Sequence, residues 1–183
     1  MSPDAKMALT PQECAEQMYA MLVETPKLDP WQLKTAFGLG FFRTWTVAEI
    51  QDEIYCLKAV VISLTVLRAF GVERATEAIQ RFRAVISAEA RRQELFERIE
   101  RHFGKYWRVL EHTLDDRWTG PAEAVPLDAV SELVGAVFAK HCRLKDTRHA
   151  TAFVSTTLLA AVVAADDLSG YEITDEGKVP GPA

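Results

Sequence analysis

The sequence of 183 residues has few cysteines, and those it has are scattered. Cys14, Cys56 and Cys142 lie far apart and form no C-x-x-C pair. An odd number of dispersed thiols argues against a disulfide framework and against a structural zinc site. We therefore expect three buried free thiols, a reducing compartment and a cytoplasmic location.

Long hydrophobic runs are also missing. The longest uncharged run covers residues 150–165, and as a helix it would be only about 24 Å long. The hydrocarbon core of a bilayer is about 30 Å thick. Residues 1–9 contain no apolar stretch typical of a secretory signal. We expect no membrane contact, and we expect the uncharged run to form a buried helix.

The sequence lacks the common motifs of catalytic and nucleotide-binding sites. Gly38-x-Gly40 follows no predicted strand, and Arg43 stands where a dinucleotide-binding motif would have its third glycine. There is no Walker lysine motif and no G-x-S-x-G elbow. The sequence therefore predicts neither an enzyme nor a bound cofactor.

A strongly basic surface is absent as well. The formal net charge is −5, and the arginines of residues 81–108 alternate with glutamates. Glu94 and Arg98, like Glu97 and Arg101, have the spacing of ion pairs on a helix surface. This pattern indicates a solvated helix face, and we expect no nucleic-acid partner.

Signals for helices, in contrast, are abundant. Thr10 with Glu13 and Thr46 with Glu49 have the spacing of capping boxes, and apolar residues recur every three or four positions after each. No segment alternates apolar and polar residues as a strand does. The sequence predicts an all-α fold without a sheet, a single bundle of six or seven helices over residues 10–169. Residues 1–9 are expected to be flexible and the acidic residues 170–183 disordered.

One predicted helix is unusually long. Gly71 is expected to end the helix before it, and helical periodicity then continues from about residue 73 to residue 116. Residues 89–94 are almost entirely polar and separate two apolar stripes. The long helix is therefore expected to be kinked or broken there.

Residues 31–45 contain five aromatic side chains and carry our main functional hypothesis. As a helix, this segment is apolar over more than half of its circumference, so it is either enclosed by the domain or covered by another chain. We interpret it as a surface for a homodimer or another protein, and the chain as a non-catalytic assembly module. The predicted partner-binding residues are Trp31, Phe37, Phe41, Phe42 and Trp45.

Two alternatives remain open. The bundle could bind a small apolar ligand or lipid among Met18, Phe37, Phe82 and the last helix. A weaker alternative is a metal-dependent enzyme using His112 with Asp115 or Asp116, since residues three and four apart share one side of a helix.

The other histidines are interpreted as structural. His141 occupies an apolar seam with Val137 and Leu144, and we expect it to be a core residue bonded to a backbone carbonyl. His102 lies among charged residues and is expected to be partly exposed. His149 flanks the start of the last helix.

Overall fold

The computed structural model confirms the all-α bundle. It describes residues 6–25, 27–39, 44–120 and 125–174, although the side chains of residues 44–46, 114–116 and 169 are not described. Six α-helices account for most of these residues: α1 (Pro11–Val23), α2 (Pro30–Ala36), α3 (Thr44–Ala90), α4 (Glu94–Leu114), α5 (Leu127–His141) and α6 (Arg148–Asp167). Short 3₁₀ turns, η1 (Asp115–Thr119) and η3 (Leu168–Gly170), follow α4 and α6.

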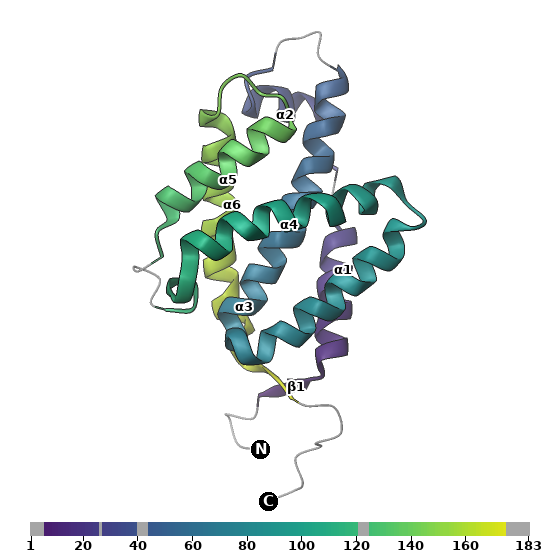
Figure 1. The fold of residues 1–183 in the computed structure, drawn as a ribbon, viewed down its shortest axis with the longest axis vertical. Coiled ribbons are helices and arrows are strands. Elements are labelled where there is room, and N and C mark those ends of the chain that lie inside the picture. Colours follow the sequence, from purple (N-terminus) through teal and green to yellow (C-terminus); the bar gives the residue numbers. More distant parts are fainter. Residues whose placement is uncertain (1–5, 26, 40–43, 121–124, 175–183) are drawn as a thin grey trace, which may run out of the picture.

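Helix α3 doubles back on itself at Gly71. The backbone there has φ 76° and ψ 167°, a conformation that residues with a side chain rarely adopt. Figure 1 shows the two parts of α3 joined by a sharp turn at the lower end of the bundle. The predicted end of a helix at Gly71 is therefore confirmed.

The predicted long helix is broken rather than continuous. Helix α3 ends at Ala90 and α4 begins at Glu94, within the polar segment. The backbone N–H groups of Arg92 and Gln93 both donate to the carbonyl oxygen of Glu89, which closes the turn. Helix α4 then crosses in front of the first part of α3, with α5 alongside it (Figure 1).

Of the two predicted capping boxes, one is present and the other is not. The capping box at α1 is confirmed, since Thr10 Oγ1 accepts from the Glu13 backbone N–H and Glu13 accepts from the Thr10 N–H. The second predicted box is wrong, because α3 begins at Thr44 and Thr46 lies inside the helix. Glu49 therefore does not take part in a capping box with Thr46.

The prediction of no sheet is also wrong, in a small way. Strands β1 (Met7–Leu9) and β2 (Tyr171–Ile173) pair in parallel, with Met7 opposite Tyr171. They lie within the segments predicted as flexible and disordered. Three-residue strands are too short to show an alternating pattern, and their partner is at the other end of the sequence.

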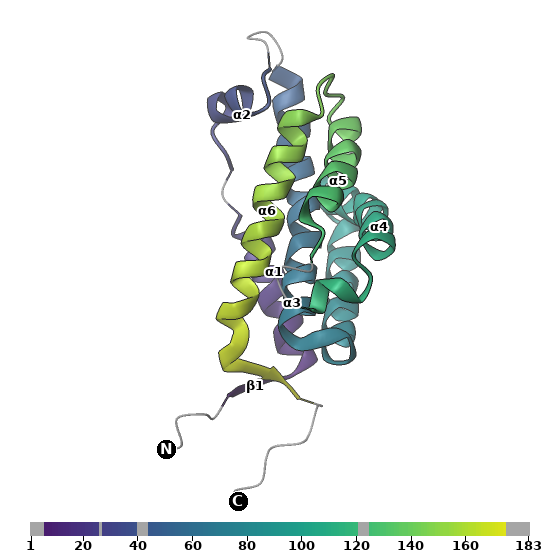
Figure 2. The same ribbon diagram turned by 90° about the vertical axis from the view of Figure 1, so that its left-hand side faces the viewer.

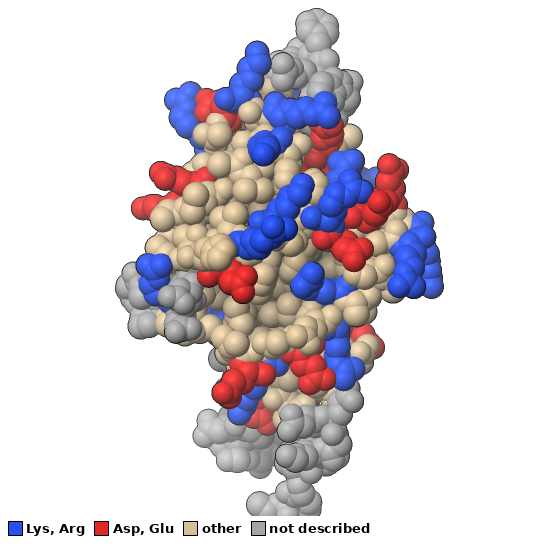
Figure 3. Space-filling view, viewed as in Figure 1, with Lys and Arg blue, Asp and Glu red and all other residues tan. Residues whose placement is uncertain are grey.

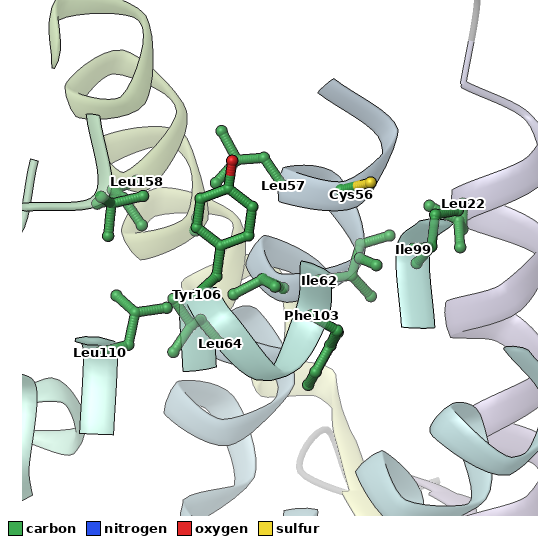
Figure 4. Close-up of a cluster of buried hydrophobic side chains, with 14 of the residues drawn as sticks. Leu22, Cys56, Leu57, Ile62, Leu64, Ile99, Phe103, Tyr106, Leu110 and Leu158 are labelled. Carbon is green, nitrogen blue, oxygen red and sulfur yellow. The ribbon is translucent and has the colours of Figure 1, made fainter. Parts of the chain in front are cut away.

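The core is formed by apolar residues from all the helices. Figure 4 shows Tyr106 of α4 among Leu57 and Leu64 of α3 and Leu158 of α6. Trp118 is 1% exposed, and its indole N–H donates to the carbonyl oxygen of Leu64. On the surface in Figure 3, basic and acidic side chains are interspersed.

Helix α6 is less buried than predicted. Figure 2 shows it along one side of the bundle, where Leu159 is 52% and Val163 58% exposed. Only the side facing α3 and α5 packs, so an uncharged helix need not be enclosed. Residues Val47–Ala90 and Arg148–Asp167 are long and apolar enough to cross a membrane, a test that core helices of soluble proteins also pass. The absence of membrane contact stays a prediction.

Candidate functional site

A buried carboxylate and two imidazoles meet where α3, α4 and α5 come together. Glu53 is 2% exposed. Its Oε2 lies 2.7 Å from Nδ1 of His102, and its Oε1 lies 2.6 Å from Nδ1 of His141. One oxygen or nitrogen atom from each of the three residues lies within 4.8 Å of the other two. We refer to Glu53, His102 and His141 as the Glu–His–His cluster.

Helical periodicity explains how each of these side chains reaches the interior. Glu53 lies on α3 between Ile50 and Leu57, which are 0% and 1% exposed. His102 lies on α4 one turn before Tyr106, whose ring is fully buried. Because residues three and four apart share a side of a helix, these apolar neighbours carry the polar groups into the core.

Tyr106 forms a further hydrogen bond to the carboxylate of the cluster. Its hydroxyl donates to Glu53 Oε1, which also receives the bond from His141. The rings of His102 and His141 are in contact, with centroids 4.0 Å apart. The Tyr106 ring meets His141 edge-on at 5.7 Å. All the hydrogen bonds of the cluster therefore converge on one carboxylate.

Glu53 is the anion of this group. Burial raises the pKa of its carboxyl, but the hydrogen bonds from His102, His141 and Tyr106 together outweigh burial and bring the pKa to about 2. Burial, followed by the charge of Glu53, raises the pKa of the nearby Cys142 thiol and of the Tyr106 hydroxyl. At neutral pH the site thus holds an ionised carboxylate beside a protonated thiol and a protonated phenol.

The residues of the cluster match the ligand preferences of divalent transition metals. Imidazole nitrogen and carboxylate oxygen bind Zn²⁺, Fe²⁺ and Mn²⁺, and three such ligands on separate elements are typical of these sites. Metal–ligand bonds of roughly 2.0–2.2 Å would place the ligand atoms about 3.0–3.5 Å apart. The present contacts of Glu53 with the two histidines are hydrogen bonds of 2.6 and 2.7 Å, so Glu53 and each histidine would have to separate by less than about 1 Å.

Comparisons with known proteins give no further guidance. No protein family, no curated protein and no solved structure matches the chain. The function of the site is therefore inferred from its own residues.

The structure separates the residues of the predicted aromatic surface. Trp31 on α2 is 63% exposed, as an interface residue would be. Phe37 is 5% exposed and stacks on Phe138 at 5.5 Å, so it belongs to the core of this chain. Phe41 and Phe42 lie outside the described residues, and Trp45 lies in α3 with its side chain undescribed. The prediction that Phe37 belongs to an exposed surface is therefore wrong, and a partner-binding role for Trp31, Phe41, Phe42 and Trp45 stays a prediction.

The residues of the other two hypotheses, the His112 metal site and the apolar ligand pocket, lie in different parts of the structure. His112 is exposed, and the side chains of Asp115 and Asp116 are outside the description, so this metal site stays a prediction. Met18 and Phe82 are core residues, 1% and 0% exposed. A cavity of about 460 Å³ lies elsewhere, between the two parts of α3 and α4; Leu64, Ile79, Phe103, Trp107, Leu110 and Trp118 line it.

The contacts of His102 and His141 with Glu53 were not predicted from the sequence. His141 is mostly buried, as predicted, but its described partner is Glu53 rather than a backbone carbonyl. His102 is only 15% exposed. The missed signal was Glu53 itself, a charged residue at the position between Ile50 and Leu57 on a predicted apolar seam. His102 likewise follows Ile99 by three residues on the apolar stripe of α4.

Proposed function

We propose that this chain binds one divalent transition-metal ion at Glu53, His102 and His141. The observation that carries the proposal is a buried carboxyl group in contact with two imidazoles from separate helices. A cation coordinated by these three groups would neutralise the buried negative charge. Imidazole and carboxylate ligands favour Zn²⁺, Fe²⁺ or Mn²⁺ over Ca²⁺ or Cu⁺.

Tyr106 fits this role as an orienting group. Ligating carboxylates are held in place by further hydrogen bonds, and loss of such partners typically weakens metal binding about 10–100-fold. The Tyr106 hydroxyl, bonded to Glu53 Oε1, is in that position. It leaves Oε2 of Glu53 as the oxygen with fewer protein contacts.

Metal content of the purified chain tests the proposal. After removal of metals with a chelator, the protein is titrated with Zn²⁺, Mn²⁺ or Fe²⁺ and the bound ion is quantified by calorimetry and elemental analysis. We expect one ion per chain, lost in His102→Ala and His141→Ala. His149→Ala is the control, because His149 is an exposed histidine on α6 outside the cluster. Circular dichroism establishes that each variant is folded.

Two outcomes contradict metal binding at this site. One is an unmodified protein that binds none of the three ions. The other is a pair of folded alanine variants that bind as much metal as the unmodified protein.

A second candidate function, assembly through exposed apolar surface, is favoured by the exposure of Trp31. Trp31 is 63% exposed, and α6 exposes Leu159 and Val163. Exposed apolar side chains of this kind are typical of surfaces that a partner covers. The partner we propose is a second copy of the chain.

Light scattering over micromolar concentrations tests assembly. We expect a dimer that Trp31→Ala weakens. Met21→Ala, which removes an exposed apolar side chain on α1, is the control and should leave the dimer unchanged. A monomer at every concentration would contradict this candidate.

A further inference from the structure

Glu49 has a buried oxygen atom without a hydrogen-bond donor among the described residues. Oε2 of Glu49 is shielded from solvent and unpaired, while Oε1 lies 3.9 Å from Nη2 of Arg143. A carboxylate oxygen that has left water requires a donor or a cation. A capping box would supply a backbone donor to this carboxylate, but Glu49 is not in one, because α3 begins at Thr44 and not after Thr46.

Glu49 lies next to the Glu–His–His cluster. It precedes Glu53 by one helical turn, so the two carboxylates project from the same side of α3. Both face the end of α5, since Glu53 Oε1 lies 2.6 Å from Nδ1 of His141 and Glu49 Oε1 lies 3.9 Å from Nη2 of Arg143. Two acidic side chains thus approach the position where His102 and His141 converge.

The charge of a loaded site favours a second carboxylate. A divalent ion bound by Glu53 and two neutral imidazoles would carry a net charge of +1 within the core. Burying an uncompensated charge is costly, whereas a second carboxylate makes the site neutral. Of the nearby cations, Arg98 pairs with Asp52 at 2.9 Å, and Arg143 lies 3.9 Å from Oε1 of Glu49.

We propose that Glu49 is the fourth ligand of the metal ion bound by Glu53, His102 and His141. This inference rests on the proposed function. The Glu49 carboxylate lies outside the group of ligand atoms within 4.8 Å of one another. Coordination would therefore require the Glu49 side chain to turn toward the ion. Four protein ligands close the coordination sphere, as in structural metal sites, so the ion would hold α3, α4 and α5 together.

Cobalt(II) serves as the probe, because its visible absorption distinguishes four-coordinate from six-coordinate sites. The full chain and the variants Glu49→Gln and Glu49→Ala are titrated with Co²⁺. We expect an intense four-coordinate spectrum for the unmodified protein. In both variants we expect at least about 10-fold weaker binding and a weaker spectrum of higher coordination number. Glu73→Gln is the control, since Glu73 is an exposed glutamate on the same helix.

The outcomes separate this inference from the proposed function. If the unmodified chain binds Co²⁺ and His102→Ala does not, the metal site stands. Glu49 variants with unchanged affinity and spectrum would then overturn the fourth ligand alone. If the unmodified chain binds no Co²⁺, both fail. Glu49→Gln is nearly isosteric and Glu49 is partly exposed, so the variant should fold, which circular dichroism verifies.

Discussion

At the scale of single residues, burial decides the chemistry of the thiols. Cys14, Cys56 and Cys142 are all free and buried, as the sequence analysis predicted. Burial is the largest cause of the raised pKa of each thiol. The pKa of Cys14 rises from 9.0 to about 11. A thiol reacts as its thiolate, so all three should be slow nucleophiles in the folded chain.

Alkylation kinetics provide the first prediction. At pH 8 the shift from 9.0 to about 11 lowers the thiolate fraction of Cys14 about 100-fold, so labelling by iodoacetamide should slow at least that much relative to the urea-unfolded chain. The rate should rise as the pH approaches 11, because the folded thiol ionises there. Mass spectrometry identifies the labelled residue. Equal rates for folded and unfolded protein at pH 8 would contradict this.

Trp118 gives a second prediction at the residue scale. Trp118→Phe removes the indole N–H that donates to the Leu64 carbonyl at 2.7 Å and leaves a small cavity. We expect a loss of about 1–3 kcal/mol in the free energy of unfolding, measured with urea. Trp31→Phe, at an exposed position, should change stability by less than about 0.5 kcal/mol.

Single residues also show what the sequence could and could not predict of the site. His141 was placed on a buried seam correctly from its spacing to Val137 and Leu144. Its partner was not found, because Glu53 is 88 positions away and the packing of α3 against α5 is set by the tertiary fold. Helical periodicity identifies the apolar side of each helix, but it does not predict which helices pack against each other.

At the scale of elements, local signals predicted well where the chain has to stop or turn. Thr10 caps α1 with Glu13, and Gly71 interrupts α3. Residues 31–45 were expected to form one helix, but α2 ends at Ala36, and Gly38 has φ 60°. A Cβ at Gly38 would lie 3.2 Å from Nε2 of His149, so α6, which is distant in sequence, packs closely against the turn after α2.

Two glycines give opposite predictions for the same substitution. Gly71→Ala meets open space but places a Cβ on a backbone at φ 76°, so we expect a loss of about 1–3 kcal/mol. Gly104 lies inside α4 with open space around it, so Gly104→Ala should gain about 0.5–1 kcal/mol from helix propensity. Urea unfolding measures both. Equal effects of the two variants would contradict the role of the Gly71 turn.

At the scale of the whole molecule, α3 is the centre of the bundle. It packs against α1, α2, α4, α5 and α6. A metal ion at the Glu–His–His cluster would link α3, α4 and α5 without any change of fold. An ion that binds the folded state and not the unfolded state would then increase the free energy of unfolding of the described chain.

Thermal unfolding measures this linkage. A concentration of Zn²⁺ 100-fold above Kd should add about 2.7 kcal/mol to the free energy of unfolding and raise Tm. A chelator should reverse the rise, and His141→Ala should show none. An unchanged Tm for the unmodified protein at saturating Zn²⁺ would contradict the linkage.

The parallel pairing of Met7–Leu9 with Tyr171–Ile173 has a consequence for folding kinetics. These two segments come from opposite ends of the described chain, so their contact has a very high sequence separation and a large loop-closure entropy. The helices must already be assembled before the contact can form at low cost. The strands are therefore expected to join last during folding and, with few partners of their own, to exchange their amide protons before the rest of the bundle opens.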